Sequence, residues 1–174
     1  MFTQLLAKSS AKQAANALYR AASDQARTET LYTQMGTPDS VEGRFELLTM
    51  HVILLIERLE GESGPAGETR QALFDTYVSN LDGALREMGV GDLAVGKRMR
   101  KLGEAFYGRA RAFQAAFDQL PDQTDLKELL ARTALQARPE TSPDGLAAYM
   151  VRRREGLRGC DLASLMSGRP VWGV

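Results

Sequence analysis

One stretch of the chain has glycines and a lysine spaced as in a phosphate-binding loop. Residues 91–97 read Gly-Asp-Leu-Ala-Val-Gly-Lys and satisfy the pattern G-x-x-x-x-G-K. Such a loop needs a strand before its glycines and a Ser or Thr hydroxyl after its lysine to hold magnesium. Here a helical pattern precedes Gly91, and Arg98 stands where the hydroxyl is needed. We therefore expect Leu93 to Val95 to form a first helical turn, without nucleotide chemistry.

The single histidine and the single cysteine do not form a metal or catalytic pattern. A di-iron bundle needs Glu-x-x-His pairs on two facing helices, but Leu48 stands three residues before His51. Cys160 alone cannot form an internal disulfide or a zinc cluster. We interpret His51 as a hydrogen-bonded core or rim residue, with a haem or metal ligand as the alternative. The prediction is a protein that is not an enzyme, with no catalytic residue, metal or cofactor.

Basic residues cluster in two places. Residues 97–101 place four cations in the first turns of a predicted helix, where the helix dipole disfavours positive charge. Arg152, Arg153 and Arg154, with Arg158, form the second cluster. Both clusters have two interpretations: solvated helix faces paired with acids, or a surface for an anionic partner. Such a partner is a ribosome, acidic lipid headgroups or the acidic loops of another protein.

Composition and periodicity predict the scaffold for these residues. The 174 residues are 44% hydrophobic and 25% charged, and 22 basic side chains balance 22 acidic ones. We therefore expect one globular domain over residues 1–174, with no specific nucleic-acid partner and with residues 1–10 and 156–174 less ordered. The most apolar run, residues 47–56, is about half of what a membrane-spanning helix needs. We expect a cytoplasmic protein.

Apolar residues repeat at spacings of three and four along most of the chain, which predicts an all-α fold: a single compact bundle of about six to eight helices. The helix through residues 47–56 is apolar nearly all round, so we expect it at the bundle centre. The predicted helices span residues 10–23, continuing or bending into 25–35, then 38–59, 68–88, 92–120, 125–137 and 143–154, with a short turn at 162–166. Residues 61–67 are the clearest predicted loop.

Two of these segments carry a resemblance. Residues 36–51 (GTPDSVEGRFELLTMH) and 85–101 (LREMGVGDLAVGKRMRK), the latter continuing through 104–109 (EAFYGR), resemble the signature of the ubiquinol–cytochrome c chaperone family. Residues 71–75 (QALFD) also fit, and the match covers about residues 32–113. The resemblance implies an assembly chaperone that binds newly synthesised cytochrome b and promotes its assembly into the ubiquinol–cytochrome c oxidoreductase complex. It resembles the bacterial form, acting in the cytoplasm or at the inner face of the plasma membrane.

A chaperone of this kind needs an exposed apolar groove edged with charge. We expect the glycine turn at residues 89–92 and the following helix to face the partner, because glycine lets another chain approach the backbone closely. The predicted partner-binding residues are Val90, Leu93, Lys97, Arg98, Arg100, Lys101, Tyr107 and Arg109. The alternative is that these glycines and Tyr107 only permit tight helix packing within the chain. Gly43 is also expected to mark a close approach.

Two other functions stay open at this point. One is a peripheral adaptor that uses its basic faces to bind the ribosome or the inner-membrane surface. The other is a haem-binding helical protein that uses His51 or the glycine turn. Mitochondrial members of the family act with a small partner protein, and neither such a partner nor an oligomeric state is predicted from this sequence.

Overall fold

The computed structural model describes the backbone of residues 2–173 and the side chains of residues 9–92 and 94–173. Over these residues the chain folds into eight helices and no strand, so the all-α prediction is confirmed. The helices are α1 (Phe2–Ala26), α2 (Glu29–Thr33), α3 (Val41–Arg58), α4 (Gly64–Glu87), α5 (Asp92–Asp118), α6 (Thr124–Ala131), α7 (Asp144–Gly159) and α8 (Leu162–Met166).

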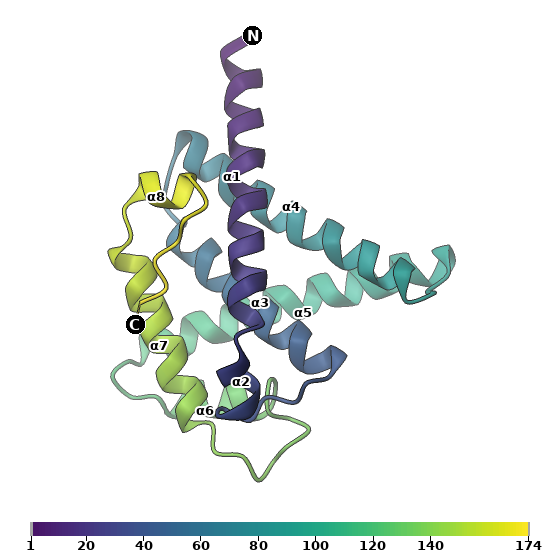
Figure 1. Ribbon diagram of the computed structural model, residues 1–174, viewed down its shortest axis with the longest axis vertical. Coiled ribbons are helices and arrows are strands. Elements are labelled where there is room, and N and C mark those ends of the chain that lie inside the picture. The colour runs from purple at the N-terminus through teal and green to yellow at the C-terminus, as the bar shows by residue number, and fades with distance from the viewer. Residues whose placement is uncertain (1, 174) are drawn as a thin grey trace.

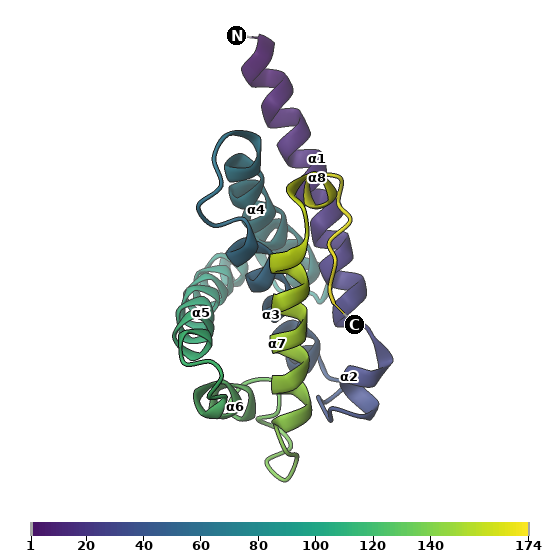
Figure 2. The same ribbon diagram turned by 90° about the vertical axis from the view of Figure 1, so that its left-hand side faces the viewer.

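Helix α3 lies at the centre, and the longer helices surround it (Figures 1 and 2). Helix α1 packs on α3 and along α4, and its N-terminal half extends beyond the other helices. Helix α7 packs on α3 and α6. Helices α4 and α5 form a long hairpin whose turn projects away from the rest of the molecule (Figure 1). This hairpin carries the second of the two segments that resemble the chaperone family.

The centre of α3 is apolar on all sides because helices contact it from several directions. Its buried apolar residues are Leu47, Met50, Val52, Ile53, Leu54 and Leu55. The helix begins at Val41, three residues later than predicted, because the Ser40 hydroxyl accepts a hydrogen bond from the Gly43 amide at 3.1 Å and caps the first turn. A Cβ at Gly43 would lie 2.0 Å from the Pro38 carbonyl oxygen. The predicted close approach is therefore made by the chain's own preceding loop.

Other predicted boundaries also move. Helix α4 begins at Gly64, inside the predicted loop, because Pro65 is suited to the first helical turn. Helix α6 ends at Ala131 rather than near residue 137, and α7 continues to Gly159 rather than ending at residue 154. Helix α5 begins at Asp92, as predicted, and the Asp92 carboxylate pairs with Arg86.

The C-terminal segment packs back on the body. After α8, which has its predicted bounds, the segment runs beside α1 and α7 (Figure 2). Gly168 lies against Ala17, where a Cβ would be 2.2 Å from the alanine methyl group. Gly156 of α7 lies so close to the Gly173 backbone that a Cβ would be 2.2 Å from its nitrogen. The Trp172 ring meets the edge of the His51 ring, with 5.4 Å between centroids.

Candidate functional site

A large open groove lies between the α4–α5 hairpin and the start of α3. It has a volume of about 850 Å³, and the end of α1, the loop before α3 and the turn after α6 complete its walls. Its apolar lining includes Ala26, Tyr32, Val41, Phe45, Leu48, Leu81, Leu85, Met88, Leu102 and Ala134. Pockets that bind ligands are likewise concave and mostly apolar. We call this feature the apolar groove.

Two large apolar side chains on the apolar groove remain open to solvent. Val41 of α3 is 62% exposed, and Met88, which follows α4, is 55% exposed. A single exposed apolar residue is ordinary, but exposed apolar residues gathered on one concave surface mark a binding site. The apolar groove therefore has the surface that a hydrophobic partner would cover.

Charged side chains edge the apolar groove. Glu42 is exposed on its rim. Arg44 donates a hydrogen bond to Asp39 at 2.5 Å, and this bond lowers the pKa of the Asp39 carboxyl. Glu46 also lines the groove, and its nearly buried carboxylate accepts two hydrogen bonds from Arg109 of α5, the Nε–Oε2 contact measuring 2.5 Å. The groove thus combines an apolar lining with a charged edge.

The predicted partner-binding residues lie on the hairpin but not on the groove wall. Among the seven whose side chains are described, none lines the apolar groove. Val90 is half-buried at the hairpin turn, and Lys97, Arg98, Arg100, Lys101 and Tyr107 are exposed along α5. Leu93 lies in the first turn of α5, and its side chain falls outside the described residues. Arg109 is half-buried because it bonds Glu46. Their binding role stays a prediction.

Sequence reasoning missed the groove itself because five separate segments assemble it. The available signal was Val41: an apolar residue at the start of an otherwise core-forming helix, within the motif at residues 36–51.

The glycines of the α4–α5 hairpin have open space where a side chain would lie. A Cβ built at Gly89, Gly91, Gly96, Gly103 or Gly108 would meet no heavy atom of the described chain within 4 Å, apart from its immediate neighbours. Gly96, Gly103 and Gly108 lie inside α5, where glycine costs about 1 kcal/mol relative to alanine, and tight packing within the chain does not explain them. Gly89 lies in the turn, and its φ of 81° favours glycine.

His51 is a satisfied core residue. It is fully buried, and its Nδ1–H donates to the Leu47 carbonyl at 2.7 Å, which leaves Nε2 to accept from the Tyr149 hydroxyl at 2.7 Å. The Tyr149 oxygen in turn accepts from Gln25 at 2.9 Å. Burial lowers the pKa of His51 to about 4. The described residues contain no group of three His, Cys, Asp or Glu side chains placed to bind a metal.

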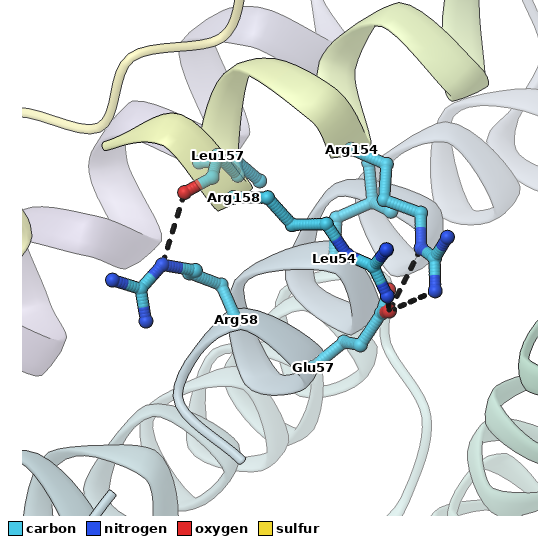
Figure 3. Close-up of a pocket in the computed structure, with 6 residues that line it drawn as sticks. All are labelled: Leu54, Glu57, Arg58, Arg154, Leu157 and Arg158. Atoms are coloured by element: carbon cyan, nitrogen blue, oxygen red, sulfur yellow. Dashed lines mark hydrogen bonds and ion pairs between the residues drawn. The ribbon is translucent and has the colours of Figure 1, made fainter. Parts of the chain in front are cut away.

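A small pocket of about 240 Å³ between α3 and α7 is lined by two arginines of the second basic cluster, Arg154 and Arg158 (Figure 3). Arg154 and Arg158 both point to the carboxylate of Glu57, at 2.6 and 3.4 Å. Arg58 donates from Nε to the Leu157 carbonyl and from Nη2 to the Cys160 carbonyl, each at 3.0 Å. These arginines therefore connect α3 to α7. Within the second basic cluster, the interpretation as paired charge holds for Arg154 and Arg158, whereas Arg152 is exposed.

The stretch that resembles a phosphate-binding loop is helical, as expected. Gly91 precedes α5, and residues 92–97 already belong to that helix. Its backbone amides are committed to helical hydrogen bonds, beginning with Ala94 and Val95 to the Gly91 carbonyl.

An all-helical body with an open apolar groove edged by charge is the arrangement of a protein that binds other polypeptides. A family model described as ubiquinol–cytochrome C chaperone matches residues 33–172, so the chain belongs to the ubiquinol–cytochrome c chaperone family. The crystal structure of the Cbp3 homolog from Brucella abortus superposes with a TM-score of 0.84 at 33% sequence identity, covering 100% of this chain and 97% of that one. No curated protein matches the chain by sequence. In the described part of the chain, no helix combines the length and hydropathy needed to cross a bilayer.

Proposed function

We propose that this chain is an assembly chaperone that binds newly synthesised cytochrome b and promotes its assembly into the ubiquinol–cytochrome c oxidoreductase complex. The observation that carries the proposal is the apolar groove, with Val41 and Met88 exposed in its lining. Membership of the chaperone family supports the class of function. The identity of the client is the proposed part, as is action in the cytoplasm or at the inner face of the plasma membrane.

The physical reason is the chemistry of an unassembled membrane protein. Before it is fully inserted, such a client exposes helices that would bury apolar side chains in lipid. An apolar helix face laid into a hydrophobic groove removes that surface from water. The groove offers about 850 Å³ for such side chains, and its charged rim is placed to meet the polar residues that flank them.

The open glycines extend this contact surface beyond the groove. A client segment can approach the α5 backbone closely at Gly96 and Gly103, where a Cβ would meet nothing. We propose that seven of the eight predicted partner-binding residues contact the client in this outer part, and that Arg109 supports them by holding α5 against α3 through its bond to Glu46.

Photo-crosslinking during client synthesis tests the proposal. A crosslinker at residue 41 should capture nascent cytochrome b, whereas one at residue 171, an exposed valine outside the groove lining, should not. In a deletion strain, spectrally intact cytochrome b should fall while its transcript stays constant. Normal levels of assembled cytochrome b without this chain would refute the function.

A further inference from the structure

We propose that Tyr149 is a positioning residue for the apolar groove, because its hydroxyl holds the end of α1 through a hydrogen bond with Gln25. Tyr149 is only 1% exposed and does not line the groove, so it acts on the groove through Gln25 and not by touching the client. The inference rests on the proposed function, since it concerns the surface that binds the client. It assigns the shape of that surface in part to a buried residue of α7.

The end of α1 forms part of the groove lining on both sides of Gln25. Ser23 lies two residues before Gln25, Ala26 and Arg27 follow it, and all three line the groove. Gln25 itself is half-buried, and its amide Nε2 donates to the Tyr149 hydroxyl at 2.9 Å. The position of Gln25 therefore determines where this part of the lining lies.

The other contacts of the segment 23–33 fix its position less firmly. The Thr28 hydroxyl donates to the Gln25 carbonyl and the Tyr32 hydroxyl to the Ala26 carbonyl, each at 2.8 Å, but both bonds stay within the segment. The last two buried residues of α1 are alanines, and apolar packing is not directional, whereas a hydrogen bond is. Among the side-chain hydrogen bonds that the structure describes for this segment, the one to α7 reaches a distant part of the chain.

Tyr149 is itself held firmly enough to serve as an anchor. Its hydroxyl donates to Nε2 of the buried His51 at 2.7 Å, which leaves the oxygen free to accept from Gln25. The Arg153 guanidinium lies over the Tyr149 ring, 4.5 Å from its centroid, and donates to the Trp172 carbonyl at 3.1 Å. These contacts fix the ring relative to α3 and the C-terminal segment, and through Gln25 they fix the end of α1.

Binding to a preorganised groove avoids the cost of ordering its lining. Loss of the Tyr149 hydroxyl releases the half-buried Gln25 amide to water, so part of the lining must then be ordered when the client binds. Tyr77 of α4 offers a matched control, because its buried hydroxyl bonds the Thr49 hydroxyl at 2.8 Å and neither residue lines the groove. Tyr77→Phe thus removes the same chemical group from the core without releasing α1.

Peptide binding to the purified full chain tests the proposal. The probe is a labelled synthetic peptide of about 20 leucine and alanine residues with lysines at both ends, followed by fluorescence anisotropy. Tyr149→Phe and Gln25→Met should each weaken binding by about fivefold. The double variant should bind no more weakly than either single variant, because both remove one shared bond. Tyr77→Phe should bind within about twofold of the wild type.

Two measurements separate positioning from general damage. If Tyr149→Phe fails to fold by circular dichroism, Gln25→Met still tests the proposal, because it leaves the bond between His51 and Tyr149 intact. Trp172 is the only tryptophan in the sequence and contacts the His51 ring, so its emission reports on this part of the core. The emission should be the same in Gln25→Met and in the wild type; weaker binding with a shifted emission would assign the loss to a disturbed core and overturn the proposal.

Val41→Asp distinguishes failure of this inference from failure of the proposed function. Unchanged binding by Tyr149→Phe and Gln25→Met, together with loss of binding by Val41→Asp, would overturn the positioning role and leave the groove as the client site. Equal losses in Tyr149→Phe and Tyr77→Phe would also overturn it. Unchanged binding by Val41→Asp would refute the groove as the binding surface, and the positioning role with it.

Discussion

Arg109 of α5 donates two hydrogen bonds to the carboxylate of Glu46 on α3, across 63 residues of sequence. Both side chains are mostly shielded from solvent, with 24% and 10% of their surface exposed. Shielding raises the cost of removing one partner, because the other charge is then left without compensation. This pair ties the α4–α5 hairpin to the central helix at the edge of the apolar groove.

We therefore predict that Arg109→Gln lowers the free energy of unfolding by about 2–3 kcal/mol, measured by urea denaturation. The double variant Glu46→Gln/Arg109→Gln should recover part of this loss, since no unpaired charge remains. The control Arg111→Gln removes an exposed arginine from the same helix and should change stability by less than about 0.5 kcal/mol. Equal effects of the two single variants would contradict the importance of the pair.

Val41 on the groove rim gives a second prediction. Val41→Asp should leave the urea midpoint nearly unchanged, because the side chain is 62% exposed. It should nevertheless reduce crosslinking to nascent cytochrome b by roughly tenfold, since a carboxylate in an apolar contact must lose its hydration. Val171→Asp, at 53% exposure, is the matched control outside the groove lining. Undiminished client capture by Val41→Asp would count against the groove as the binding site.

Substituting two glycines of the α4–α5 hairpin tests fold stability and client binding separately. Gly96→Ala/Gly103→Ala should raise the free energy of unfolding by about 1–2 kcal/mol, because alanine favours the helix and meets nothing within 4 Å at either position. If a client approaches α5 there, the same variant should capture less client despite its higher stability. A more stable variant with full client capture would show that the glycines serve no contact.

Gly43→Ala should have the opposite effect and destabilise the fold. Its Cβ would lie 2.0 Å from the Pro38 carbonyl oxygen, so the loop or the first turn of α3 must move. We expect a loss of about 1–3 kcal/mol in the free energy of unfolding, measured by the same denaturation. An unchanged free energy of unfolding would mean that the loop before α3 can move at little cost.

Burial of His51 predicts a pH dependence of stability. Its pKa is about 4 in the folded chain and near 6.5 when unfolded, so between these values only the unfolded state takes up the proton. Stability is therefore unaffected by His51 above pH 6.5, and it falls as pH drops from 6.5 to 4, by about 3 kcal/mol in total. The side chains that face the ring include Tyr149, Trp172 and the Arg153 cation.

Urea denaturation at several pH values measures this effect. His51→Gln lowers stability overall but should show a shallower decline over the same range, since glutamine does not titrate. Parallel curves for the two proteins would refute a buried neutral His51.

Local patterns predicted most of the helices, and long-range contacts account for what they missed. Helix α8 has its predicted bounds because Asp161 caps it locally, its carboxylate accepting from the Ser164 amide at 2.8 Å. The start of α3 was wrong by three residues because the Ser40 cap competes with the helix-starting tendency of Pro38. The hairpin was predicted to be the partner-facing element, but the groove beside it is lined by residues as distant in sequence as Val41 and Ala134, which periodicity cannot show.

The contact between Trp172 and His51 has a consequence for the biosynthesis of the chain itself. His51 belongs to the central helix, and one of its ring contacts is made by a residue 121 positions later in the sequence. While the chain is being translated, this contact cannot form until residue 172 has left the ribosome. The packing around the central helix is therefore completed late in the synthesis of the chain.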